Sequence, residues 1–276
     1  MCRETIIGKI GLALLFFLLG GILAGAAFAQ SSYITMNVDD PGTISGVVKW
    51  SGPVPKIPKL PITKNADICD PESAKIRDLE RLEINSDGEV ENTVVYLKDI
   101  SKGKAMDLPE ERWHMDQKTC RYVPHIMLVP VGGNLQIKSD DPILHTVHMS
   151  GAASNNIPFP FQGQYISATM REKGVVDLKC NAGHVWMNGE VLVVKNPYVA
   201  VTDSHGAFKM TGVPPGQYEI EAWHEGWRII SEESVLDVSS QVEVKRPIYS
   251  APETWSKKVV VKPNQTSQVD FALSER

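Results

Sequence analysis

The residues with the clearest chemical potential lie in one short stretch, Cys180-Asn181-Ala182-Gly183-His184-Val185-Trp186-Met187. It holds a thiol, an imidazole and a thioether, and it falls between two segments with strand character. Soft sulfur ligands stabilise reduced copper, and imidazole serves both oxidation states of copper. Zinc fits less well, because closed structural zinc sites use more cysteine and histidine. The stretch therefore predicts a copper site with Cys180, His184 and Met187 as ligands.

A site of this kind needs a second imidazole, and residues 141–148 offer two. Side chains alternate along a strand, so His145 and Val147 share one face while His148 lies on the other. Only one of the two histidines can readily face the same interior site. We predict His145, because it follows the Asp140-Asp141-Pro142 turn where a strand begins. His148 is the alternative ligand.

The N-terminus has the features of an export signal. Arg3 and Lys9 precede an almost uninterrupted apolar run over residues 10–28, which ends in Ala27-Phe28-Ala29 before Gln30. This pattern predicts a signal peptide over residues 1–29. An uncleaved anchor is the alternative, because the run approaches the roughly 20 residues that span a bilayer, and it would be the chain's one contact with a membrane. Either way, a periplasmic or extracellular location is expected.

The chain has four cysteines, of which Cys2 lies in the signal segment. Three remain, an odd number for a protein in an oxidising compartment. The simplest partition pairs Cys69 with Cys120 as a structural disulfide and leaves Cys180 as a metal-bound thiolate. The donors around Cys180 favour this partition, although other pairings stay open. A buried core cysteine is the alternative role for Cys180.

Composition places the chain among globular proteins and argues against one class of partner. Its 276 residues are 42% hydrophobic and 22% charged, with a net charge of −5. The Lys and Arg residues are scattered, and no clustered basic face of the kind that binds nucleic acid is indicated. No nucleic-acid partner is expected.

Short alternating segments separated by turn residues predict an all-β protein built as antiparallel sandwiches. The only moderately helical stretch after the signal is residues 70–82, and residues 151–164 have the composition of a loop. The other histidines, among them His224, are interpreted as structural, and for His125 a surface contact with a partner is the alternative. The expected strands cover residues 43–50, 92–97, 125–129, 134–138, 144–149, 174–179, 190–194, 218–223, 235–242, 258–261 and 269–273.

Over roughly residues 121–194 the motifs resemble the plastocyanin/azurin-like cupredoxin family. The resemblance rests on Gly132-Gly133 before a strand, on the turn before His145-Thr146-Val147, and on the Cys180 loop. It implies a Greek-key sandwich that holds one type-1 copper ion through His145, Cys180, His184 and Met187.

One spacing departs from the family pattern. Three residues separate Cys180 from His184, where plastocyanin-like loops usually have two. This spacing is closer to the binuclear copper centre of cytochrome oxidase, whose second cysteine would fall at Val176. A mononuclear site is therefore the better inference.

The flanking segments resemble a carboxypeptidase-regulatory-like (transthyretin-like) β-sandwich. The motifs are Gly42-Thr-Ile-Ser-Gly-Val-Val and Thr202-Asp-x-x-Gly-x-Phe followed by Val213-Pro-Pro-Gly-x-Tyr. Because both belong to one domain in that family, residues 42–100 and 197–276 are expected to form a second sandwich. The cupredoxin-like residues 115–196 would then be inserted into it. Two consecutive sandwiches are the alternative.

The expected function is one-electron transfer without catalysis, so the chain is not expected to be an enzyme. Cys180 would conduct the electron, Met187 would be the weak axial ligand, and His184, taken as the imidazole nearest the surface, would be the exit. A redox protein such as a cytochrome or a dehydrogenase is the expected partner. The alternatives are a copper carrier or storage module, and an envelope scaffold or adhesion protein with a degenerate copper loop.

Overall fold

The computed structural model describes residues 33–275. The expected signal peptide, residues 1–29, lies outside the described residues. The described part is nearly all strand, with one four-residue helix and one short 3-10 helix, Glu110–Arg112. Within residues 33–275 no helix is long and apolar enough to cross a bilayer. The expectation of an all-β protein is confirmed.

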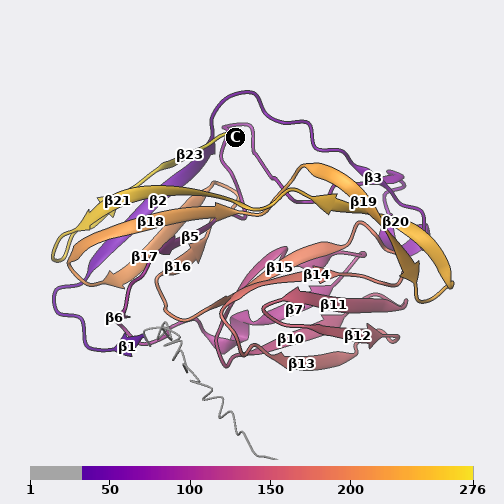
Figure 1. The fold of residues 1–276 in the computed structure, drawn as a ribbon, viewed down its shortest axis with the longest axis horizontal. Coiled ribbons are helices and arrows are strands. Elements are labelled where there is room, and N and C mark those ends of the chain that lie inside the picture. Colours follow the sequence, from indigo (N-terminus) through magenta and orange to yellow (C-terminus); the bar gives the residue numbers. More distant parts are fainter. Residues whose placement is uncertain (1–32, 276) are drawn as a thin grey trace, which may run out of the picture. The chain divides into compact units, whose positions relative to one another are not determined.

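The central part of the chain forms a sandwich of two sheets, which we call the inserted sandwich (Figure 1). One sheet has the order β13-β10-β7-β8 and the other the order β12-β11-β14-β15-β9. Its strands are β7 (His114–Gln117), β8 (Tyr122–Val123), β9 (Ile126–Pro130), β10 (Asn134–Ser139), β11 (His145–Gly151), β12 (Asn155–Phe159), β13 (Tyr165–Thr169), β14 (Gly174–Lys179) and β15 (Asn188–Val194).

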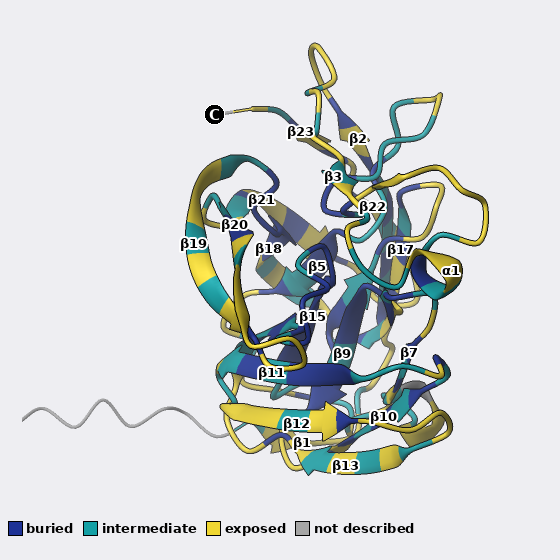
Figure 2. Ribbon diagram, turned by 90° about the vertical axis from the view of Figure 1, so that its right-hand side faces the viewer, coloured by how far each residue is buried: buried dark blue, intermediate teal, exposed yellow. Residues whose placement is uncertain are grey.

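Alternation of side chains explains the core of this sandwich. Leu135 and Ile137 of β10 and Val176 and Leu178 of β14 are buried, while the residues between them are partly exposed. The buried faces of the two sheets pack together, as sandwich sheets do. Figure 2 shows β9, β11 and β15 largely buried, whereas β12 and β13 carry exposed residues. The expectation of a loop over residues 151–164 is wrong, because β12 pairs with β11 along its length.

A second sandwich, the outer sandwich, is built from both ends of the described chain. Its sheets have the orders β16-β5-β18-β21 and β17-β2-β22, with β23 also paired to β2. Strands before residue 98 therefore share sheets with strands after residue 198, and the inserted sandwich lies between β5 and β16 in sequence. The strands are β2 (Gly42–Trp50), β5 (Val94–Leu97), β16 (Val199–Val201), β17 (Ala207–Val213), β18 (Gly216–His224), β21 (Glu253–Val261), β22 (Thr266–Gln268) and β23 (Phe271–Leu273).

Two segments of the outer part pack against the inserted sandwich. One is residues 57–82, the cover segment, with β3 (Leu60–Pro61), α1 (Ala66–Cys69) and β4 (Ile76–Arg77). The other is the hairpin of β19 (Ile229–Asp237) and β20 (Val242–Tyr249). Cys69 and Leu79 of the cover segment lie in the core of the inserted sandwich, and Ile229 and Tyr249 of the hairpin pack on it. A short parallel pair, β1 (Ile34–Thr35) with β6 (Lys102–Gly103), completes the structure.

The expectation of a helix over residues 70–82 is wrong. The helix covers only Ala66–Cys69, and the Asp70 side chain accepts hydrogen bonds from the backbone amides of Ala74 and Lys75 at 2.8 and 2.7 Å. An aspartate that binds nearby amides in this way competes with helix formation. Lys75 also has a positive φ of 63°, which no right-handed helix accommodates.

A buried charged cluster joins the cover segment to both sandwiches. Arg81 forms an ion pair with Glu225 at 2.7 Å, and it donates hydrogen bonds to Glu190 at 3.4 Å and to Asn188 at 2.8 Å. His125 also pairs with Glu225. All five side chains are buried. His125 and Glu225 are thus structural residues in this cluster.

Burial and neighbouring charge set the protonation of the cluster. Burial alone would lower the pKa of His125, but the Glu225 carboxylate raises it above its usual value. Burial would raise the pKa of Glu225, but His125 and Arg81 lower it. Burial and the nearby Glu225 charge raise the pKa of Glu190 well above its usual value. The Glu225 carboxylate therefore lies between Arg81 and His125, and the shift at Glu190 favours the neutral form of that side chain.

Replacement of Arg81 by Met should lower the free energy of unfolding by about 3–5 kcal/mol, because it leaves the Glu225 charge buried without its guanidinium partner. Urea unfolding followed by tryptophan fluorescence measures the change. Lys98→Met is the matched control: Lys98 pairs with Glu219 and Glu221 at the surface, where such pairs contribute about 1 kcal/mol or less. An equal effect of the two substitutions would contradict this assignment.

Candidate metal centre

The Cys180 loop connects β14 to β15 at one end of the inserted sandwich. Cys180 and His184 have no exposed surface, and Met187 is 2% exposed. The Met187 amide donates to the carbonyl oxygen of His184 at 3.0 Å and closes a turn. Gly183 has a φ of +82°, and a Cβ there would lie 2.5 Å from Asp237 of the β19–β20 hairpin. Only glycine fits this turn under the hairpin.

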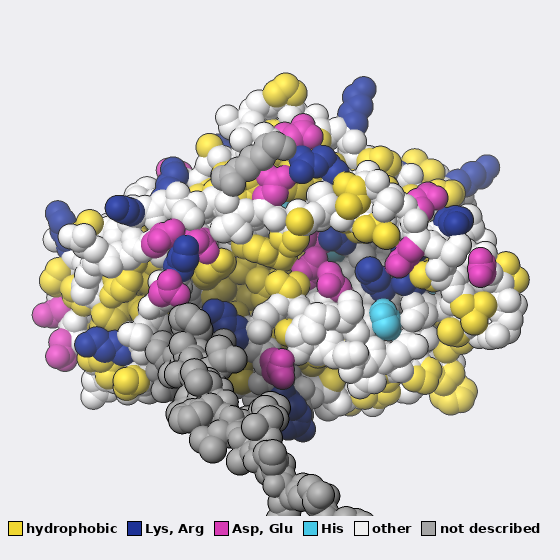
Figure 3. Space-filling view, in the orientation of Figure 1, with side chains coloured by type: hydrophobic (Ala, Val, Ile, Leu, Met, Phe, Trp, Pro, Cys, Tyr) yellow, Lys and Arg dark blue, Asp and Glu magenta, His cyan; other side chains and the backbone are white. Residues whose placement is uncertain are grey.

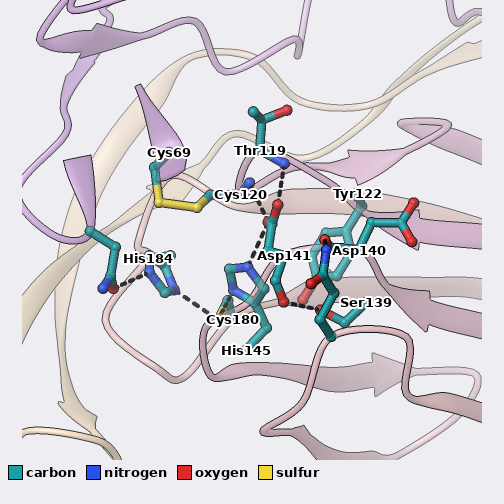
Figure 4. Close-up of polar contacts among 12 residues, drawn as sticks. Cys69, Thr119, Cys120, Tyr122, Ser139, Asp140, Asp141, His145, Cys180 and His184 are labelled. Carbon is teal, nitrogen blue, oxygen red and sulfur yellow. Dashed lines mark hydrogen bonds and ion pairs between the residues drawn. A yellow bond between two sulfur atoms is a disulfide. The ribbon is translucent and has the colours of Figure 1, made fainter. Parts of the chain in front are cut away.

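Two imidazoles converge on the sulfur of Cys180 (Figure 4). Sγ lies 3.8 Å from Nδ1 of His145 and 3.6 Å from Nδ1 of His184. The candidate ligand atoms of the three residues all lie within 4.8 Å of one another. The Thr146 amide donates to the same sulfur at 3.4 Å. The structure therefore brings together three of the four ligands predicted from sequence.

The far nitrogen of each imidazole has its own polar partner. Nε2 of His145 lies 2.9 Å from the Asp141 carboxylate, and Nε2 of His184 lies 3.0 Å from the Asn65 side-chain oxygen. Because these partners are acceptors, each Nε2 carries a proton, and in the neutral ring Nδ1 is left with the lone pair that faces Cys180. The outer contacts thus fix the tautomer that a metal requires.

A disulfide ties these two outer partners together. Cys69 and Cys120 are bonded, with Cα atoms 5.1 Å apart. The amide of Cys69 donates to the Asn65 carbonyl oxygen at 2.8 Å, and the Cys120 amide donates to the Asp141 carboxylate, also at 2.8 Å. Thr119 donates a second amide to Asp141 at 2.7 Å. Asn65 and Asp141, the partners of the two imidazoles, are therefore each hydrogen-bonded to one of the two disulfide-bonded cysteines.

Electrostatics favour an ionised sulfur at this point. Burial would raise the pKa of the Cys180 thiol, but His145 and His184 hold it well below its usual value. Burial would lower the pKa of His145, but the Asp141 carboxylate and Cys180 raise it to about 9. The Asp141 carboxyl has a lowered pKa: burial opposes the shift, and hydrogen bonds from His145 and two amides produce it. These shifts favour a Cys180 thiolate beside a positively charged His145, whose Nδ1 proton a metal ion would displace.

The distances fit a first-row metal ion. Typical metal–sulfur and metal–nitrogen bonds of about 2.3 and 2.0 Å, with angles of about 110–120°, place the two donor atoms about 3.5–3.7 Å apart. The two Sγ to Nδ1 distances are 3.6 and 3.8 Å. One thiolate with two imidazoles is the donor set typical of copper. The residues present fit a copper ion.

The remaining candidates lie in different surroundings. Met187 is buried in the same core as Cys180, in the same loop. His148 is half-buried and lines a groove with Lys179 and Arg246 on the other face of β11. His148 is not part of the group formed by His145, Cys180 and His184.

The interpretation of His184 as the imidazole nearest the surface is wrong. Its side chain is fully buried, with Asn65 of the cover segment at Nε2 and the Trp186 ring 5.6 Å away between centroids. Asn65 comes from outside the inserted sandwich, so motifs within that sandwich gave no sign of it.

Sequence reasoning also missed the residues that support the ligands. In the sequence Asp141 stands out only as part of a turn. Its position four residues before His145 was the one feature that pointed to a carboxylate close to this histidine. Arg246 donates to the carbonyl oxygen of Cys180 at 2.7 Å and to the Asn181 side chain at 2.8 Å from the distant β20. Neither Arg246 nor Asn65 stands out in the sequence.

Comparison with family models gives one match. Residues 194–249 match the second β-sandwich domain of the BOS complex subunit NOMO1-like family. This range runs from the end of β15 to the end of β20 and supports a β-sandwich in this part of the chain. The comparison with curated proteins found no match. The transthyretin-like resemblance of the flanking motifs stays a prediction.

Solved structures give several likenesses, each over less than a third of this chain. A purple cupredoxin from Nitrosopumilus maritimus is 21% identical, with 29% of this chain and 98% of that chain covered and a TM-score of 0.26. A point mutant of amicyanin in its Cu(I) form is 23% identical, with coverage of 32% and 87% and a TM-score of 0.28. The copper-containing nitrite reductase of Thermus scotoductus SA-01 is 16% identical, with coverage of 30% and 22% and a TM-score of 0.27.

Asp141→Asn should weaken copper binding about 10- to 100-fold, because loss of such an outer partner misorients a histidine ligand. Competition with a chelator of known copper affinity measures the change. Asp140→Asn is the matched control: the adjacent carboxylate pairs with Lys138 and has no contact with His145 among those observed. An affinity unchanged in Asp141→Asn would contradict the role of this carboxylate.

Proposed function

We propose that this chain is an exported copper protein that carries single electrons through a mononuclear site and catalyses no reaction of its own. The observation that carries the proposal is the buried sulfur of Cys180 between two imidazole Nδ1 atoms. His145, Cys180 and His184 would hold the ion, and Met187 would supply a weak fourth ligand. Copper bound there supplies a one-electron couple.

The rigidity of the site supports electron transfer over reversible copper carriage. Both imidazoles are fixed at their far nitrogens, and the Cys180 loop is held by Arg246 and by the amide of Val238, which donates to Asn181 at 2.9 Å. Ligands that cannot rearrange favour a small structural change between the two oxidation states. Their burial also slows release of the ion to a chelator or to another protein.

The route to a partner has to avoid His184, because that ring is covered. From Cys180 the chain passes directly to Asn181, which lines a surface groove of about 410 Å³. His148, Lys179 and Leu236 line the same groove, and Leu236 is 49% exposed. We place the contact with a redox protein, such as a cytochrome or a dehydrogenase, at this groove.

Two further features agree with an exported protein that binds no nucleic acid. A disulfide between Cys69 and Cys120 suits an oxidising compartment. Figure 3 shows acidic and basic side chains interspersed on the visible face, without a continuous basic field. Export itself rests on the N-terminal sequence.

Copper-loaded protein should show an intense visible absorption from thiolate-to-copper charge transfer and a reversible one-electron wave in voltammetry. Cys180→Ser should lose the absorption band entirely, because no thiolate ligand remains. Optical and spin-resonance spectra of both proteins provide the measurement. His148→Ala is the control and should keep the spectrum. A wild-type protein that retains no copper would select the scaffold alternative instead.

A further inference from the structure

We propose that reduction of the Cys69–Cys120 disulfide creates a second copper site, which binds Cu(I) through these two thiols beside His184. The inference rests on the proposed copper-binding function and extends it: the redox state of the disulfide would set how many copper ions the protein holds. The two states are a disulfide form with one site and a dithiol form with two.

The disulfide lies against the first site. The sulfur atoms of Cys69 and Cys120 and a ring nitrogen of His184 all lie within 4.8 Å of one another, and all three residues are fully buried. On the other side, Cys120, Asp141 and His145 form a second group with the same spacing. Figure 4 shows the disulfide next to the histidine and aspartate side chains. Six potential ligand residues therefore share one buried region.

The oxidation state of the sulfurs decides whether they bind metal. A disulfide sulfur carries no negative charge, whereas thiolate is the form of cysteine that ligates metals. Two thiolates form a soft donor set by themselves, as in linear two-coordinate sites, and soft thiolate ligands select Cu(I). The reduced protein would thus offer three thiols where the oxidised protein offers Cys180 alone.

The electron and proton balance is simple. A dithiol reductant transfers two electrons and two protons to the S–S bond, which breaks to give two thiols, and the reductant becomes a disulfide. A phosphine supplies the same two electrons: it takes an oxygen atom from water and becomes a phosphine oxide, and the two protons of that water go to the thiols. Binding of one Cu(I) ion by both sulfurs releases two protons to solvent. Cu(II) would reverse the change: two Cu(II) ions accept two electrons from the two thiols and become Cu(I), two protons go to solvent, and the S–S bond forms again. The site therefore requires Cu(I) without oxygen.

Reduction would also loosen the cover over the first site. Cys69 ends α1, and Asn65 at the start of that helix binds Nε2 of His184. Without the cross-link, α1 is held to the inserted sandwich only by noncovalent contacts. These include the Arg77 guanidinium, which donates to the Thr119 carbonyl oxygen at 3.1 Å. The looser helix gives an entering ion access to the two thiols and to the ring of His184.

The test is the number of Cu(I) ions bound. Full-length mature protein is divided into a disulfide sample and a sample reduced with a phosphine, which is then removed by gel filtration under nitrogen. Both are titrated with Cu(I) against bathocuproine disulfonate. We expect one equivalent in the disulfide sample and two in the reduced sample. Re-oxidation of the reduced sample should lower its bound Cu(I) from two equivalents to one.

A Cys69→Ser/Cys120→Ser variant should bind one equivalent with or without the phosphine, and Cys180→Ser should keep the gain of one equivalent on reduction. The second variant keeps the inference testable if the first does not fold. X-ray absorption of the reduced wild type should show additional copper–sulfur contacts. No gain on reduction would overturn the inference. Absence of copper from the disulfide sample would instead contradict the proposed function, so the two failures are distinguishable.

Discussion

The centre depends on the hydrogen bonds made by the outward nitrogens of its two imidazoles. Asp141 and Asn65 accept these bonds at 2.9 and 3.0 Å, and they thereby turn the lone pairs of both Nδ1 atoms toward one sulfur. A neutral imidazole has one donor and one acceptor nitrogen, so fixing the first decides the second. The Sγ to Nδ1 distances of 3.6 and 3.8 Å agree with these supports.

The insertion of one sandwich into the sequence of the other explains both the outer contacts at the centre and the burial of the Cys180 loop. The outer sandwich contributes the cover segment and the β19–β20 hairpin, and both reach the Cys180 loop of the inserted sandwich. Lys64 of the cover segment pairs with Asp237 of the hairpin, next to Gly183. Exclusion of water from the loop strengthens the charge interactions inside it, because the local dielectric is low. Without these additions, this end of the inserted sandwich would be exposed to solvent.

Local chemistry in the sequence was sufficient to find three residues that the structure brings together, His145, Cys180 and His184. A period of two identified β10 and β14, and the spacing of Cys180, His184 and His145 indicated a common site. Features that depend on distant contacts were not predictable in this way. Asn65 reaches His184 across 119 positions and Arg246 reaches Cys180 across 66, with no local pattern at either end. The helix expected over residues 70–82 failed for a local reason, since Asp70 binds amides that a helix would need.

The central claim is that one sulfur and two imidazole nitrogens bind the same ion. X-ray absorption at the copper edge of the disulfide-bonded protein tests it most directly, because it reports the ligands of the metal itself. The account predicts one short copper–sulfur distance and two copper–imidazole distances, with the sulfur contribution lost in Cys180→Ser. A copper ion surrounded only by nitrogen and oxygen in the wild-type protein would contradict it.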